Sequence, residues 1–175
     1  MTGSTICIAA LGRERPGIVA AITGVIFDRD CNIRDSTMTI LGGEFAMMLI
    51  VELPASIALS VLEQALAEVQ RRFELGVFIK RLGEEELRYQ QAPGTKDWAV
   101  TIYGGDRKGM LHHVASLMAR KCISITELKT RVLGGMESAG IISMKLAAPP
   151  AVELAEIQAQ LQDVAARFGV EVSIG

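Results

Sequence analysis

The chain contains an internal repeat, and this feature limits its possible folds more than any other. The triplet Leu41-Gly42-Gly43 recurs 92 positions later as Leu133-Gly134-Gly135. At the same spacing three further positions match: Arg15 with Arg107, Gly17 with Gly109, and Ile33 with Ile125. A repeat of this length predicts two copies of one supersecondary unit within the 175 residues.

Each copy shows the same order of hydrophobic patterns. In the first copy, β-rich runs predict strands over 5–11, 33–41, 44–53 and 77–82. Apolar residues three or four positions apart predict one amphipathic helix after Pro16 and a second over 62–73. The second copy repeats this order from Trp98 to a last strand over 170–174. The order β-α-β-β-α-β is that of a ferredoxin-like domain.

We therefore predict an α+β protein made of two tandem ferredoxin-like domains, 1–82 and 97–175, joined by a polar linker over 83–96. Each domain is expected to hold an antiparallel sheet with both helices on one face. The run 45–51 is apolar on both faces of its strand, which predicts that the open face of the sheet is covered in a homo-oligomer.

Composition excludes several classes of function. A net charge of −2 and a pI near 5.7 argue against direct DNA binding. The three cysteines are too far apart in the sequence for a metal knuckle or a redox pair, so we expect them to be reduced and mostly buried in a cytoplasmic protein. No apolar run is long enough to span a membrane. Catalytic, metal-binding and phosphate-binding motifs are missing, so we predict a non-enzyme with no cofactor.

Two polar segments are not explained by packing. The loop Arg13–Gly17 opens a helix whose free N–H groups attract a carboxylate, and Gly17 permits a close approach. The segment 32–36 offers the amide of Asn32 and the carboxylate of Asp35. If strands one and two bring these segments together, they suit a free amino acid. Residue chemistry leaves open that Asn32 caps the helix end and that Pro16-Gly17 only shapes a turn.

The chain resembles the ACT domain family through three segments of the first copy. They are Glu14-Arg15-Pro16-Gly17-Ile18-Val19, Cys31-Asn32-Ile33-Arg34-Asp35-Ser36 and Leu41-Gly42-Gly43-Glu44-Phe45. The stricter form of the second and third segments is similar to one branch, the glycine cleavage system transcriptional repressors, which consist of two ACT domains.

The resemblance implies an amino-acid effector, with glycine favoured and serine next. The implied ligand-binding residues are Glu14, Arg15, Pro16, Gly17, Asn32 and Asp35, in a pocket completed by the other repeat or another subunit. The second-copy equivalents are Asp106, Arg107, Gly109 and Ser124; there Lys108 replaces the proline, Ser124 replaces the asparagine, and Cys122 stands where the family often has glycine.

The resemblance also implies a protein partner. The first expectation is a transcriptional regulator of the glycine cleavage system that acts through a separate transcription factor. The alternative is an accessory subunit that modulates an enzyme of an amino-acid pathway by direct contact.

Overall fold

The computed structural model describes residues 3–87, 93–105, 107–133 and 139–175, which divide into two compact units, Met1–Tyr89 and Gln90–Gly175. The first unit contains β1 (Ser4–Arg13), α1 (Ile18–Phe27), β2 (Asn32–Leu41), β3 (Glu44–Leu53), α2 (Leu59–Phe73) and β4 (Gly76–Leu82), followed by the short helix α3 (Glu84–Leu87). The second unit contains β5 (Lys96–Gly105), α4 (Met110–Arg120), β6 (Ser124–Leu133), β7 (Ala139–Ala148), α5 (Leu154–Phe168) and β8 (Val170–Ile174).

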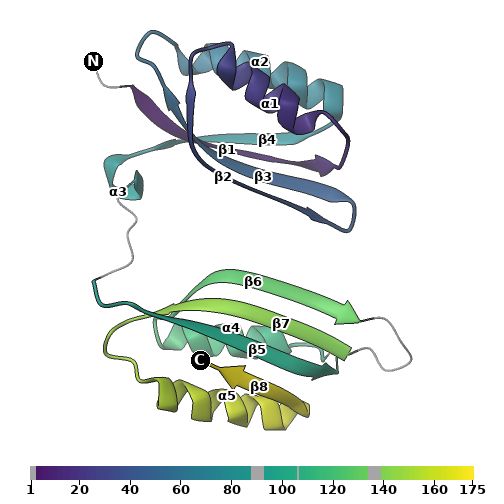
Figure 1. Ribbon diagram of the computed structural model, residues 1–175, viewed down its shortest axis with the longest axis vertical. Helices are drawn as coiled ribbons and strands as arrows, with labels where there is room; N and C mark the ends of the chain where they lie inside the picture. The colour runs from purple at the N-terminus through teal and green to yellow at the C-terminus, as the bar shows by residue number, and fades with distance from the viewer. Residues whose placement is uncertain (1–2, 88–92, 106, 134–138) are drawn as a thin grey trace. The chain divides into compact units, whose positions relative to one another are not determined.

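Each unit is a four-stranded antiparallel sheet with two helices on one face (Figure 1). The strand order is β2-β3-β1-β4 in the first unit and β6-β7-β5-β8 in the second. The predicted fold of two tandem ferredoxin-like domains is confirmed. We call the sheet surface opposite the helices the open face of each unit.

Alternation along the strands places the core under the helices. In β1 the even residues Ile6, Ile8 and Ala10 are buried, whereas the odd residues point to the open face. The amphipathic pattern of α2 buries Leu62 and Leu66 against them. The second unit has its own cluster, built in the same way around Val100, Ile102, Met118, Leu146 and Ile157. Every buried residue in the described ranges is apolar.

Tight turns lie where the sequence predicts them. Gly42 and Gly43 join β2 to β3 with φ values of 62° and 85°, which glycine adopts without strain. Their second-copy counterparts, Gly134 and Gly135, lie outside the described residues. The turns after α1 and α4 place Asp30 and Cys122 in the left-handed region, at φ values of 52° and 53°.

The structure differs from the sequence-based expectations in three places. The predicted linker contains α3, which Glu86 ties back to β4 through an ion pair with Lys80 (2.6 Å), and β5 already begins at Lys96. The three cysteines are free, but Cys7 and Cys31 are only half-buried and Cys122 is exposed, because each lies at a turn or on the open face. The first strand extends to Arg13 because its last residues pair with β3.

No helix in the described part of the chain has the length and apolar character needed to cross a membrane.

Candidate functional site

The loop between β1 and α1 holds four of the predicted ligand-binding residues. The Glu14 amide donates to the carbonyl oxygen of Gly43 (2.9 Å), which fixes the loop against the β2–β3 hairpin. Gly17 begins α1 at φ 97°, and its carbonyl accepts the Ala21 amide (2.9 Å). The first-turn amides of Val19 and Ala20 have no acceptor within the helix. This end of α1 therefore offers hydrogen-bond donors and the positive end of the helix dipole.

Arg15 is tied to the end of α2. Its guanidinium donates to Glu74 at 2.6 Å, and Glu74 is the left-handed residue that ends the helix, at φ 57°. The neighbouring Phe73 faces Gly17, where its ring lies 3.7 Å from the position that a β-carbon would take. Both side chains of the ion pair remain partly exposed, so the pair positions the loop more than it stabilises the fold.

Asn32 stands at the first position of β2, opposite Glu52 of β3. It is not needed to cap α1, because other groups satisfy the last helix carbonyls. The amide of Cys31 donates to Ile26 (3.1 Å), and the Arg29 guanidinium donates to Val25 (3.0 Å). The exposed Asn32 side chain borders two hollows, one beside Asp30 and Glu52 and one along α1 beside Thr23 and Phe27.

Asp35 lies on the open face of the sheet, opposite Ile50 of β3. A bulge at Arg34 lies between Asn32 and Asp35, so they stand opposite Glu52 and Ile50, which are neighbours along the open face of β3. The Asp35 carboxylate accepts the Ser36 amide (2.8 Å), and Arg34 pairs with Glu52 (3.1 Å).

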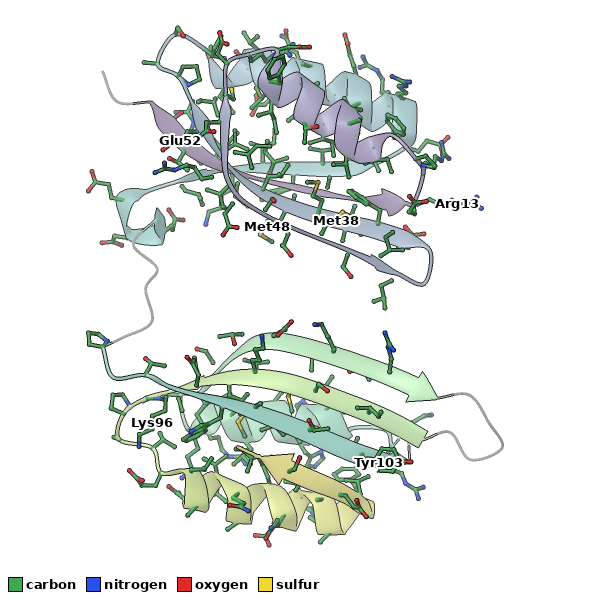
Figure 2. The ribbon with its side chains drawn as sticks, in the orientation of Figure 1. Arg13, Met38, Met48, Glu52, Lys96 and Tyr103 are labelled. Atoms are coloured by element: carbon green, nitrogen blue, oxygen red, sulfur yellow. The ribbon has the colours of Figure 1, made fainter. Side chains whose placement is uncertain are left out.

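The two predicted halves of the ligand site lie at opposite ends of the sheet. Asn32 and Thr5 both face Glu52, whereas Arg13 faces Glu44. Figure 2 shows Glu52 and Arg13 towards opposite ends of the sheet. Eight residues of strand, at about 3.3 Å each, separate these ends by roughly 26 Å. Strands one and two also do not adjoin, because β3 runs between them. Strands one and two therefore do not bring the two segments together within one unit, and a pocket that uses both Gly17 and Asn32 stays a prediction that needs another repeat or subunit.

The second-copy loop has a different construction. Asp106 lies outside the described residues, Arg107 lies in the loop, and Gly109 begins α4 at φ 85°. His113 occupies the place of Ala21: its ring packs edge-on against Phe168 (5.2 Å), and Nδ1 lies 2.9 Å from the Gly109 carbonyl oxygen. Gly169 stands where Glu74 stands in the first copy and supplies no carboxylate. Ser124 begins β6 opposite Ala147.

Sequence reasoning missed the Arg15–Glu74 pair. The two residues are 59 positions apart, and no spacing rule connects them. Glu74 aligns with Gly169 of the second copy, and a glycine there indicates a left-handed turn. It does not indicate that Arg15 contacts this position.

Sequence reasoning also did not locate the apolar hollow at the centre of the first open face, about 490 Å³ in volume. The alternation in β1 and β3 pointed to an apolar open face without showing that its middle is concave.

Comparison with known proteins identifies relatives of this chain. The ACT domain family model matches residues 4–80. A UPF0237 protein from Methanosarcina mazei is 36% identical over 90 residues, which are 51% of this chain and 96% of that protein. The glycine cleavage system transcriptional repressor of Escherichia coli is 28% identical over 126 residues, 72% of this chain and 64% of that protein.

Solved structures share the whole fold. A protein of unknown function from Galdieria sulphuraria has a TM-score of 0.84 and 23% identity, with 98% of this chain and 97% of that chain covered. A protein provisionally assigned as a glycine cleavage system transcriptional repressor has a TM-score of 0.70 and 18% identity, with 99% and 96% covered. At these identities the structures establish the fold alone. The sequence matches show that this chain belongs to the ACT domain family.

Proposed function

We propose that this protein is a non-catalytic regulator that binds a small amino acid, with glycine favoured and serine next, and passes the signal to a protein partner. Its target is the transcription of the glycine cleavage system, reached through a separate transcription factor. Membership of the ACT domain family and homology to the Escherichia coli repressor support a regulatory role.

The exposed start of α1 is the observation that carries the ligand part of this proposal. Gly17 holds the backbone in a left-handed turn, so the first-turn amides lie at the surface beside the anchored Arg15. These donors suit the carboxylate of an amino acid, which is held best where the helix dipole is positive. The exposed amide of Asn32, which the helix end does not use, suits the ammonium group.

These two groups cannot hold one small ligand from a single unit, because α1, about 15 Å long, runs from the one to the turn that precedes the other. In the proposed site a second ferredoxin-like unit supplies the missing end. The site then exists only in an assembly, so ligand binding and association of the units are coupled.

Ligand-dependent unfolding of the full chain tests this proposal. Glycine or serine at 100 times its dissociation constant should stabilise the protein by about 2.7 kcal/mol. Asn32→Ala should abolish this increment, and the matched second-copy variant Ser124→Ala should leave it intact. If Asn32 contributes only to the stability of the fold, Asn32→Ala lowers the stability of the free protein by about 1 kcal/mol and keeps the increment. If no amino acid shifts the unfolding of the parent protein at millimolar concentration, the effector proposal is wrong.

Binding to duplex DNA tests the partner part of the proposal. A protein with a net charge of −2 gains little from phosphate contacts, so the purified chain should show no sequence-specific, sub-micromolar binding to the control region of the glycine cleavage genes. Such binding by the chain alone, measured by fluorescence anisotropy, would mean that no separate transcription factor is needed.

A further inference from the structure

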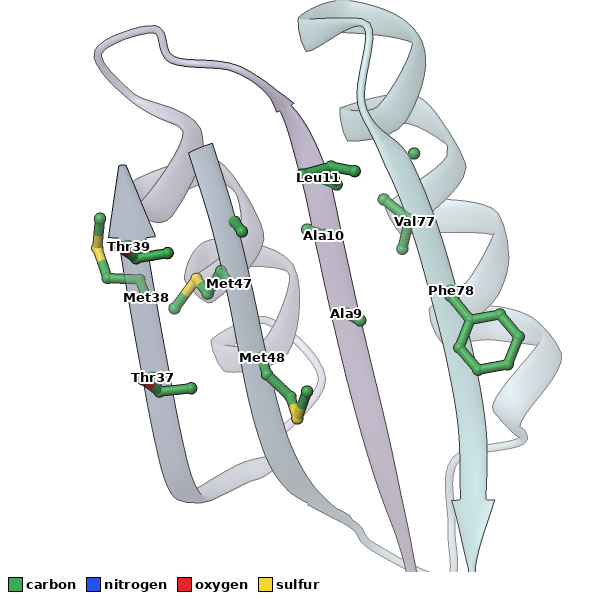
Figure 3. A pocket seen from close by; sticks show the side chains of 12 residues that line it. Ala9, Ala10, Leu11, Thr37, Met38, Thr39, Met47, Met48, Val77 and Phe78 are labelled. Carbon is green, nitrogen blue, oxygen red and sulfur yellow. The ribbon is translucent and has the colours of Figure 1, made fainter. Parts of the chain in front are cut away.

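The open face of the first unit carries two adjacent rows of uncharged side chains, which we call the apolar rows. One row crosses the sheet as Thr37, Met48, Ala9 and Phe78, and the next as Thr39, Ala46, Leu11 and Gly76. Leu11 is 58% exposed, Met48 49% and Phe78 66%. The rows surround the apolar hollow, and Figure 3 shows Met48 and Phe78 on either side of Ala9.

Charged residues border the apolar rows at both ends of the sheet. Next to the row that contains Leu11, Arg13 faces Glu44. Next to the row that contains Met48, a further row begins with Asp35 and ends with Lys80. An uncharged centre with a charged border is the usual anatomy of a protein interface. Exposed apolar patches of this kind mark interaction sites.

The second unit has the opposite character at the same place. Its row equivalent to Thr37, Met48, Ala9 and Phe78 consists of Lys129, Ser143, Thr101 and Ser173. The row equivalent to Thr39, Ala46, Leu11 and Gly76 consists of Arg131, Ile141, Tyr103 and Glu171. Burying these charges against an apolar surface would cost their hydration, so the second open face is a poor match for the first. The face that matches the apolar rows best is the same face of another copy.

The order of large and small residues makes the apolar rows self-complementary. On three strands, one row holds a large residue where the other row holds a small one. These pairs are Met48 with Ala46, Leu11 with Ala9, and Phe78 with Gly76. A two-fold axis that lies between two stacked sheets, perpendicular to the strands, exchanges the two rows. Each large side chain then faces the small residue of the same strand in the other copy, at the usual sheet spacing of about 10 Å.

The face is large enough for such a pair. Three strands of ten residues and one of seven, about 4.8 Å apart, give the whole open face roughly 600 Å² per copy, so two copies bury roughly 1,200 Å². This is the lower limit of specific interfaces, where weak and transient complexes lie, so we expect a weak dimer.

We propose that two copies of this chain associate through the apolar rows of their first units, related by a two-fold axis perpendicular to the strands. This interaction surface is separate from the proposed ligand site, which lies at the ends of the sheet. Its test measures association without any ligand, so its failure can be distinguished from failure of the proposed function.

Sedimentation of the full chain and three variants tests the proposal. The parent protein should dimerise with a dissociation constant on the order of micromolar. Leu11→Asp should weaken association at least about 100-fold, because it buries a charge in the interface. The repeat equivalent Tyr103→Asp, on the open face of the second unit, is the matched control and should dimerise normally.

Gly76→Leu distinguishes a defined interface from nonspecific hydrophobic association. A β-carbon at Gly76 has room, with its nearest contact at 3.7 Å, so the variant should fold normally. Although it adds apolar surface, it fills the position that receives Phe78 and should weaken dimerisation at least about 10-fold. Tighter association in this variant would overturn the two-fold arrangement.

The native cysteines provide an independent readout. Cys7 lies on the same open face, two residues from Ala9, and should react more slowly with thiol reagents as the protein concentration rises. Cys122, exposed in the second unit, should react at a constant rate. A monomer at concentrations well above the micromolar range, or a dimer that Leu11→Asp leaves intact, would overturn the proposal.

Discussion

Gly17 and Gly24 lie at the start and in the middle of α1, and the same substitution should affect them in opposite directions. Gly17 has φ 97°, so Gly17→Ala should lower the free energy of unfolding by about 1–2 kcal/mol. Gly24 is helical, and an added β-carbon there meets no atom within 4 Å. Gly24→Ala should therefore raise the free energy of unfolding by about 0.5–1 kcal/mol, as measured by urea unfolding. Equal effects would mean that the left-handed turn is not required.

Glycine at position 122 should give a more stable protein than the native cysteine. Its φ of 53° is unfavourable for a side chain, and the residue is exposed. Cys122→Gly should stabilise the second unit by about 1 kcal/mol. Asp30→Gly at the equivalent turn is the comparison, and it should gain less because aspartate adopts this conformation more readily. A loss of stability in Cys122→Gly would show that the thiol makes a stabilising contact.

The conformation of these two turns could be predicted from the sequence, whereas the geometry of the candidate site could not. The left-handed positions at 30 and 122 follow from their place between a helix and a strand, so the sequence indicates them. The position of Asn32 relative to Gly17 does not follow, because it depends on which strands adjoin and in which direction they run. The sequence thus predicted the residues of the candidate site but not the distance between them.

The strand pair β6–β7 carries a charged cluster that should make the second unit sensitive to acid. Glu127 accepts hydrogen bonds from Lys129 on its own strand and from Lys145 directly opposite, each at 2.8 Å, which lower its pKa to about 2. The unfolded chain has an ordinary pKa near 4.5. The stabilising contribution is therefore complete above pH 4.5 and is lost as the pH falls towards 2.

The variant Glu127→Gln should remove this part of the pH dependence. Unfolding by urea between pH 2 and 4.5, the interval between the folded and unfolded pKa values, should show a shallower slope in the variant than in the parent. An NMR titration of the Glu127 carboxyl group gives the pKa directly. A value near 4.5 would mean that the lysines do not hold the carboxylate.

Element boundaries were well predicted where patterns are strong. The bounds of β3 and β8 agree with the apolar runs 44–53 and 170–174. The short helix α3 was missed because its acidic run, Glu84–Glu86, is equally typical of an exposed linker; it forms where Glu86 contacts Lys80 and the Gly83 amide. Edge strand β2 is exposed along its whole length, which periodicity alone does not distinguish from a half-buried strand.

At the scale of the whole molecule, the separate cores predict separate responses to core mutations. Leu49 and Leu146 are almost fully buried, each in the cluster of its own unit. Leu49→Ala should destabilise the first unit by about 2–5 kcal/mol, and Leu146→Ala should do the same to the second. Native-state hydrogen exchange, followed by unit, should show that each mutation leaves the amides of the other unit protected. Loss of protection in both units would mean that they unfold together.

The unequal open faces of the two repeats also set the valency of the chain. A self-complementary patch that occurs once per chain is used up when two chains meet, so growth stops at a closed pair. Had both repeats retained Met48, Leu11 and Phe78 or their equivalents, every chain would carry two such patches, and chains could join end to end without limit. In the proposed dimer, Lys129, Ser143 and Ser173 of the second repeat leave the chain with one self-complementary patch, so the assembly closes at two copies.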